Sequence, residues 1–134
     1  MGVRSFDALT LMKRILIVED KATSRELLRT VLEQQGHCVI EAKDGEEAVQ
    51  HLKAATLDLV LLDLQIPIRN GYDVLRLIRK DHRLAGLPVI ALTASAMQGD
   101  REKAIAAGFT AYIAKPVGPA QLREEITRLL GSNA

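Results

Sequence analysis

Asp58-Leu59-Val60-Leu61-Leu62-Asp63 is a short apolar run that begins and ends on an acidic residue. Continuous runs of this length and composition are typical of strands buried on both faces of a parallel sheet. A second run, Ile15-Leu16-Ile17-Val18, is followed directly by two more acids, Glu19 and Asp20. The two runs predict buried parallel strands that carry carboxylates at their ends.

Helical patterns alternate with these runs along the chain. Apolar residues at helical spacing follow each run, and Gly36 and Gly108 are expected to end two of the helices. Asp44 is expected to begin another, with Glu47 completing a capping box. Strand–helix alternation repeated five times predicts an α/β fold, with helices on both faces of one parallel sheet. The expected strands are 15–18, 38–42, 58–63, 88–93 and 111–114.

The bulk composition fits one globular domain without an obvious charged partner. The chain has 134 residues, 48% of them hydrophobic, and its formal net charge is +1. This balance predicts no general affinity for nucleic acid or for anionic membranes. Strong patterning covers residues 13–131, so we expect residues 1–12 to be a disordered or vector-derived leader and residues 132–134 to be a short tail.

Cysteine content and hydropathy point to a reducing compartment. Cys38 is the only cysteine, which rules out an intrachain disulfide, and we expect it to be a small buried apolar residue. No apolar run approaches the length of a membrane span, and the first residues lack a signal-peptide core. A cytoplasmic protein without membrane association is the prediction.

Polar side chains end the strongest strands. Glu19, Asp20, Asp63, Thr93 and Lys115 occupy these positions, and ligand sites in such sheets lie beyond the carboxyl ends of the strands. Crowded carboxylates repel one another, and a divalent cation relieves the repulsion. Oxygen ligands without histidine or cysteine favour Mg²⁺, while a lysine and a hydroxyl suit a phosphoryl group. A carboxylate can itself accept that group as an aspartyl-phosphate.

Four motifs together resemble the receiver domain of bacterial two-component response regulators. They are Ile17-Val18-Glu19-Asp20, Leu61-Leu62-Asp63-Leu64-Gln65-Ile66-Pro67, Leu92-Thr93-Ala94 and Lys115-Pro116. The resemblance covers residues 13–131, nearly the whole chain. It implies a flavodoxin-like sheet of five parallel strands in the order 2-1-3-4-5.

The resemblance also implies a role for each residue of the site. Asp63 would be the phosphoacceptor, and Mg²⁺ would be held by Glu19, Asp20, Asp63 and the backbone carbonyl of Gln65. Lys115 would pair with the phosphoryl group, and its bond to Pro116 is expected to be cis.

A signalling switch, and not a metabolic enzyme, is the function that the resemblance implies. A histidine kinase or a histidine phosphotransfer protein would supply the phosphoryl group. Thr93 would move to bond it and Tyr112 would follow, which changes the surface of the helix that ends at Gly108, the strand 111–114 and the last helix. A downstream protein would read that surface. The chain would be a stand-alone receiver or a part of a hybrid kinase.

Two positions depart from the usual pattern and keep alternatives open. Lys21 follows the acidic pair, where a cation could weaken the metal site, and Arg69 lies in the loop after Asp63, where it could contact a partner or only solvent. A degenerate receiver that docks without phosphorylation is therefore the alternative function. An aspartyl phosphatase is less favoured because Gln65 stands where that class has a second aspartate, and no phosphate-binding loop supports a flavin site.

Overall fold

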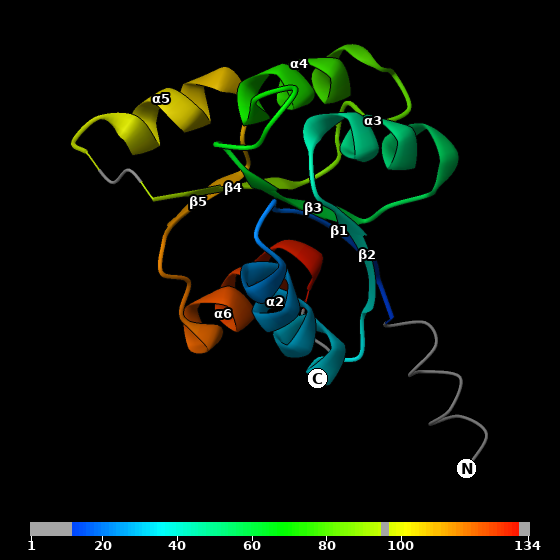
Figure 1. The fold of residues 1–134 in the computed structure, drawn as a ribbon, viewed down its shortest axis with the longest axis vertical. Helices are drawn as coiled ribbons and strands as arrows, with labels where there is room; N and C mark the ends of the chain where they lie inside the picture. Colours follow the sequence, from blue (N-terminus) through cyan, green and yellow to red (C-terminus); the bar gives the residue numbers. More distant parts are fainter. Residues whose placement is uncertain (1–11, 95–96, 132–134) are drawn as a thin grey trace.

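The computed structural model describes residues 12–94 and 97–131 (Figure 1). Its elements are β1 (Arg14–Val18), α2 (Ala22–Gln34), β2 (Cys38–Ala42), α3 (Gly45–Ala54), β3 (Leu59–Asp63), α4 (Gly71–Lys80), β4 (Val89–Thr93), α5 (Asp100–Ala107), β5 (Ala111–Ala114) and α6 (Pro119–Leu130). The predicted tail and residues 1–11 of the predicted leader lie outside the described residues, and Met12 is exposed.

The strands form one parallel sheet in the order β2-β1-β3-β4-β5. Helices α2 and α6 cover one face, and α3, α4 and α5 cover the other (Figure 1). The predicted flavodoxin-like architecture is therefore confirmed. All five strands end at the same edge of the sheet, which is the edge where a ligand site is expected.

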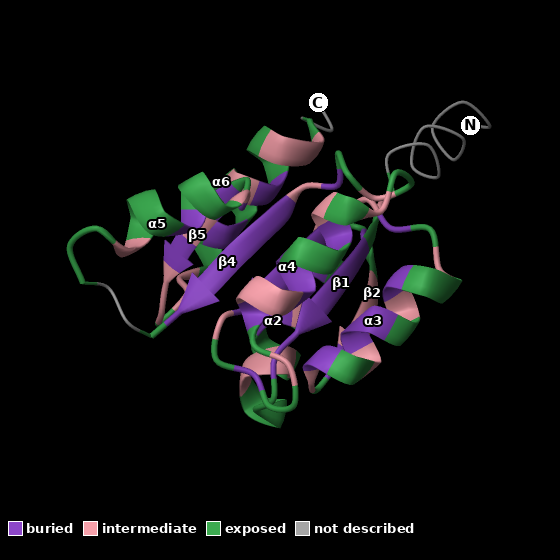
Figure 2. Cartoon of the chain, turned by 90° about the horizontal axis from the view of Figure 1, so that it is seen from above, coloured by how far each residue is buried: buried purple, intermediate pink, exposed green. Residues whose placement is uncertain are grey.

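Alternate side chains of the three central strands enter two hydrophobic layers. In β1, Leu16 and Val18 pack under the α3–α4–α5 face, whereas Ile15 and Ile17 pack under the α2–α6 face. Figure 2 shows β4 buried along its length and β1 buried after its exposed first residue, Arg14, and β3 is buried at all five positions. Burial on both faces explains why these strands are continuous apolar runs and not alternating ones.

Side-chain caps and one close backbone approach fix the helices around the sheet edge. Asp44 accepts a hydrogen bond from the Glu47 amide at 2.8 Å, as predicted, and Asn70 accepts one from the Asp73 amide at 3.0 Å. Gly71 is the first residue of α4. A Cβ there would lie 2.9 Å from the Asp63 carbonyl oxygen, so only glycine lets α4 begin this close to β3.

The prediction that Cys38 is buried is wrong. Cys38 is the first residue of β2 and is exposed. β2 is an edge strand that pairs only with β1 among the described residues, so no second strand in this part of the chain covers its start.

Candidate functional site

The carboxyl edge of the sheet brings the five predicted strand-end residues together. Glu19, Asp63 and Thr93 are buried, whereas Asp20 is exposed. Backbone hydrogen bonds hold the residues that follow β1 and β5, since the amide of Glu19 donates to Ala42 and that of Lys115 donates to Thr93. Glu19 and Lys115 are therefore placed by continuation of the strand pairing and not by free loops.

Three carboxylates gather at this edge. Glu19, Asp20 and Asp63 each offer one carboxylate oxygen, and these atoms lie within 4.8 Å of one another. A group of carboxylates this close is unfavourable unless positive charge is near. An oxygen-only set of this kind fits a hard divalent cation such as Mg²⁺ and suits a thiophilic metal poorly.

Lys115 supplies positive charge from the end of β5. Its Nζ donates to Glu19 Oε1 at 2.6 Å and to Asp63 Oδ2 at 2.5 Å. Burial is the largest single influence on the Lys115 pKa and would lower it, but the hydrogen bonds and charges of Asp63 and Glu19 together raise that pKa above its usual 10.5. Lys115 is therefore a fixed cation between two buried carboxylates.

Backbone amides hold the second oxygen of each buried carboxylate. Asp63 Oδ1 accepts a hydrogen bond from the Gln65 amide at 2.8 Å, and Glu19 Oε2 accepts one from the Lys21 amide at 3.1 Å. Each carboxylate is thus oriented from two sides, with one oxygen on an amide and the other on Lys115. Such preorganised geometry is what phosphoryl transfer requires of a protein.

Thr93 and Tyr112 line a hollow of about 230 Å³ next to the site. Gln65, from the loop that follows Asp63, lines the same hollow. Burial, followed by the charge of Asp100, raises the pKa of Tyr112 above its usual 10. Tyr72 contacts the edge of Phe109, with ring centroids 5.6 Å apart. The hollow is lined by Leu64, Gln65, Tyr72, Thr93, Asp100, Lys103 and Tyr112.

Lys21 and Arg69, the two residues that depart from the usual receiver pattern, differ in their ion pairing. Lys21 is exposed, and its ammonium makes no ion pair with any residue that the structure describes. Arg69 pairs with Glu46 on α3, with Nε to Oε2 at 3.1 Å. Arg69 therefore ties the loop after Asp63 to α3. The bond between Lys115 and Pro116 is cis, as the resemblance implies.

Two residues that the sequence does not single out support the acidic pair. Arg25 on α2 donates from Nη1 to the backbone carbonyls of Glu19 and Asp20 at 2.9 and 3.1 Å. Its Nε donates to Glu41 Oε1 at 3.0 Å. The only sequence signal is that Glu41 interrupts the apolar run of β2, which is unfavourable unless the acid has a partner.

Fold and site together define a receiver module of two-component signalling. The chain belongs to the response regulator receiver domain family, whose model matches residues 15–127. Proteins of this class generally act in signalling rather than as metabolic enzymes. No helix in the described part of the chain is both long enough and apolar enough to cross a membrane.

Individual relatives agree with this assignment over most of their length. The polar-differentiation response regulator DivK of Brucella anthropi is 37% identical over 119 residues, which span 89% of this chain and 97% of the relative. The receiver domain of the sensor histidine kinase PA1611 of Pseudomonas aeruginosa superposes with a TM-score of 0.82 at 36% identity, covering 90% of this chain and 99% of its own. That structure holds a magnesium ion in its active-site cleft. The chemotaxis response regulator CheY4 of Vibrio cholerae gives a TM-score of 0.83 at 25% identity, covering 88% and 98% of the two chains.

Proposed function

We propose that this chain is a phosphorylation-dependent switch that accepts a phosphoryl group on Asp63 in a Mg²⁺-dependent reaction. The observation that carries the proposal is the arrangement of Asp63, a buried carboxylate that ends β3 beside Glu19, Asp20 and the ammonium of Lys115. A lone strand-end aspartate has many structural roles. A buried one that shares a lysine with a second carboxylate is poised for chemistry.

Asp63 is the nucleophile in this proposal. One carboxylate oxygen attacks the phosphorus of a phosphohistidine on a histidine kinase or a phosphotransfer protein, forming an O–P bond as the P–N bond breaks. Lys115 then shifts its contact from Asp63 to the incoming phosphoryl oxygens, where it neutralises their charge. The same site hydrolyses the acyl phosphate slowly, which returns the switch to its resting state.

Glu19, Asp20, Asp63 and the backbone carbonyl of Gln65 are the proposed Mg²⁺ ligands. When bound, the ion neutralises charge on the transferring phosphoryl group. The magnesium in the cleft of the Pseudomonas aeruginosa receiver supports this choice of metal, as do the three carboxylates of this chain. The protein's own part is to hold these oxygens close together before the metal arrives.

The proposed readout is the surface of α5, β5 and α6. Thr93 moves toward the phosphoryl group, and Tyr112 follows into the space beside it. Phosphorylation thereby favours one of two existing conformations because it bonds differently in each. A downstream protein partner docks on the favoured surface, or the phosphoryl group passes on in a relay.

Phosphorylation by acetyl phosphate with Mg²⁺ tests the proposal. Intact-mass spectrometry is expected to find one acid-labile phosphoryl group on the wild type and none on Asp63→Asn. Asp73→Asn, which removes a partly exposed carboxylate in the first turn of α4, is the matched control and is expected to label like the wild type. Equal labelling of Asp63→Asn would sink the assignment of Asp63. A folded wild type that takes no phosphoryl group would favour a module that docks without phosphorylation.

A further inference from the structure

The three carboxylates of the site are not held equally. Glu19 and Asp63 each have a hydrogen bond on both oxygens, one from a backbone amide and one from Lys115. The Asp20 carboxylate is exposed and makes no hydrogen bond or ion pair with any residue in the described part of the chain. Its place beside the other two therefore depends on the backbone that carries it.

Arg25 is the side chain that holds this backbone. Its Nη1 donates to two successive carbonyls, those of Glu19 at 2.9 Å and Asp20 at 3.1 Å. Fixing two successive carbonyls fixes the peptide planes on both sides of Asp20, and with them its φ and ψ. The direction of the Asp20 Cα–Cβ bond follows from those angles.

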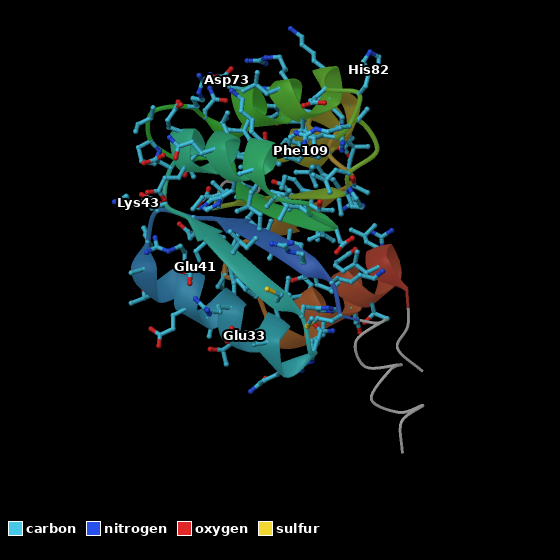
Figure 3. All side chains as sticks on the ribbon, turned by 90° about the vertical axis from the view of Figure 1, so that its right-hand side faces the viewer. Glu33, Glu41, Lys43, Asp73, His82 and Phe109 are labelled. Carbon is cyan, nitrogen blue, oxygen red and sulfur yellow. The ribbon has the colours of Figure 1, made fainter. Side chains whose placement is uncertain are left out.

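Glu41 on β2 aims Arg25 at this turn. Its Oε1 accepts from Arg25 Nε at 3.0 Å, while its Oε2 accepts from Arg29 Nη1. Figure 3 shows Glu41 on β2 next to α2, which carries both arginines. The Arg25 side chain is only 19% exposed, so the guanidinium is enclosed between the helix, the strand and the turn. A planar, permanently charged fork reaches the carboxylate and the two carbonyls from separate nitrogens in a fixed geometry, whereas the donors of a lysine all lie on one nitrogen.

We propose that Arg25, oriented by Glu41, is a positioning residue that sets the direction of the Asp20 carboxylate for the cation site. The inference rests on the proposed function, because it assumes that Asp20 helps to hold Mg²⁺. Residues that orient metal ligands in this way commonly contribute about 10–100-fold to metal affinity or activity.

The sign of the effect separates positioning from simple electrostatics. Arg25 is a cation near a site for a cation, so its charge alone weakens Mg²⁺ binding. Removing it would strengthen binding if charge were its only influence. If Arg25 positions Asp20, removing it weakens binding instead.

Mg²⁺ titration of the full chain tests this, with the metal alone as the probe and backbone amide NMR shifts of Glu19, Asp20 and Asp63 as the readout. Arg25→Ala is expected to raise the Mg²⁺ Kd roughly 10-fold, and Glu41→Gln to raise it less. Arg29→Ala is the matched control, since it removes a charge from the same helix but leaves both carbonyl contacts of Arg25 in place. Its Kd is expected to stay within about twofold of the wild type.

Urea unfolding without Mg²⁺ accompanies each titration. Should Arg25→Ala not fold, Arg25→Lys carries the same prediction with a smaller change, because a lysine keeps the charge and loses the fork. An unchanged or lower Kd in the folded Arg25 variant, with normal binding by the wild type, would overturn the positioning role alone. A wild type that binds no Mg²⁺ would overturn the proposed metal site and this inference together.

Discussion

The two edges of the sheet use polar side chains in different ways. At the amino edge, side chains bond to backbone groups, as when Asp58 Oδ2 accepts from the Arg14 amide at 2.8 Å and Thr110 Oγ1 accepts from the Val89 amide at 3.0 Å. At the carboxyl edge, side chains bond to backbone groups as well, but charged side chains also bond to one another, with Lys115 between Glu19 and Asp63.

This difference separates groups that complete the fold from groups that, in the proposed function, bind a ligand. Neutral backbone partners at the amino edge satisfy orphan donors and acceptors, which is a direct contribution to stability. The carboxyl edge keeps three carboxylates against one half-buried ammonium, an arrangement that a cation or a phosphoryl group would change on binding in the proposed function. Mg²⁺ should therefore restore stability that is lost by a substitution at the carboxyl edge but not stability that is lost at the amino edge.

Arg79 at the amino edge gives the largest expected loss of stability. Its guanidinium donates to the carbonyls of Gly108, Ala85 and Leu87, which join α4 to the starts of β4 and β5. Arg79→Ala leaves these carbonyls without their donor, and we expect it to lower the free energy of unfolding by about 3 kcal/mol. Urea denaturation checks this value, and Mg²⁺ should not restore the loss.

The control for Arg79 lies on the same helix. Arg76 is 61% exposed and pairs only with Asp73 in the described part of the chain, so Arg76→Ala should change stability by about 0.5 kcal/mol or less. Similar losses of stability in Arg79→Ala and Arg76→Ala would contradict the claim that Arg79 stabilises the junction of α4 with the starts of β4 and β5.

Lys115 at the carboxyl edge gives the next largest effect. Lys115→Ala leaves the buried carboxylates of Glu19 and Asp63 without their counter-charge, and we expect a loss of about 2 kcal/mol in metal-free buffer. Added Mg²⁺ should reduce the loss because it neutralises the same carboxylates. Lys43→Ala, which removes an exposed lysine 3.9 Å from Glu47, should be nearly silent. If Mg²⁺ does not reduce the stability loss of Lys115→Ala, the proposed difference between the two edges is wrong.

The pH dependence of stability gives the smallest effect and again differs between the edges. Burial, followed by the charge of Lys13, lowers the pKa of His37 below its usual 6.5, and His37 Nδ1 accepts a hydrogen bond from the Lys13 amide. The unfolded chain therefore takes up a proton first, so the stability that His37 contributes is present above pH 6.5 and is lost as the pH falls below it.

Lys115 works in the opposite pH window. Because its pKa is raised, the stability that Lys115 contributes is present below pH 10.5 and is lost only as the pH rises through the pKa of the folded state.

Urea unfolding of the wild type and of His37→Asn at several pH values measures the contribution of His37. The two curves should be separate above about pH 7 and approach each other as the pH falls below 6.5. Parallel curves would contradict the role of His37.

The sequence is a good guide to this fold because its strongest signals have one physical origin. The run that ends at Asp63 is apolar at every position since β3 is buried on both faces, and burial leaves only its carboxyl end for chemistry. The same logic predicts Thr93 and Lys115 at the ends of β4 and β5. Asp44 and Gly108 follow local rules of helix capping, which need no knowledge of the rest of the chain.

Features that depend on distant contacts could not be predicted in this way. The contact of Lys115 with Glu19 joins residues 96 positions apart, and Arg25 matters only because α2 lies beside the turn that follows β1. Cys38 is apolar in character but begins an edge strand, and nothing in its immediate neighbours reveals that position. Local pattern fixes the elements, whereas their packing decides which side chains meet.

Peptide mapping of the phosphorylated chain tests the central claim most directly. Borohydride reduces an acyl phosphate to an alcohol, so treatment after labelling with acetyl phosphate and Mg²⁺ marks the residue that carried the phosphoryl group. We predict that the mark falls on Asp63 and on no other carboxylate, although Glu19 and Asp20 have oxygens within 4.8 Å of it. A mark on Glu19 or Asp20, or on a residue away from the carboxyl edge, would contradict the account.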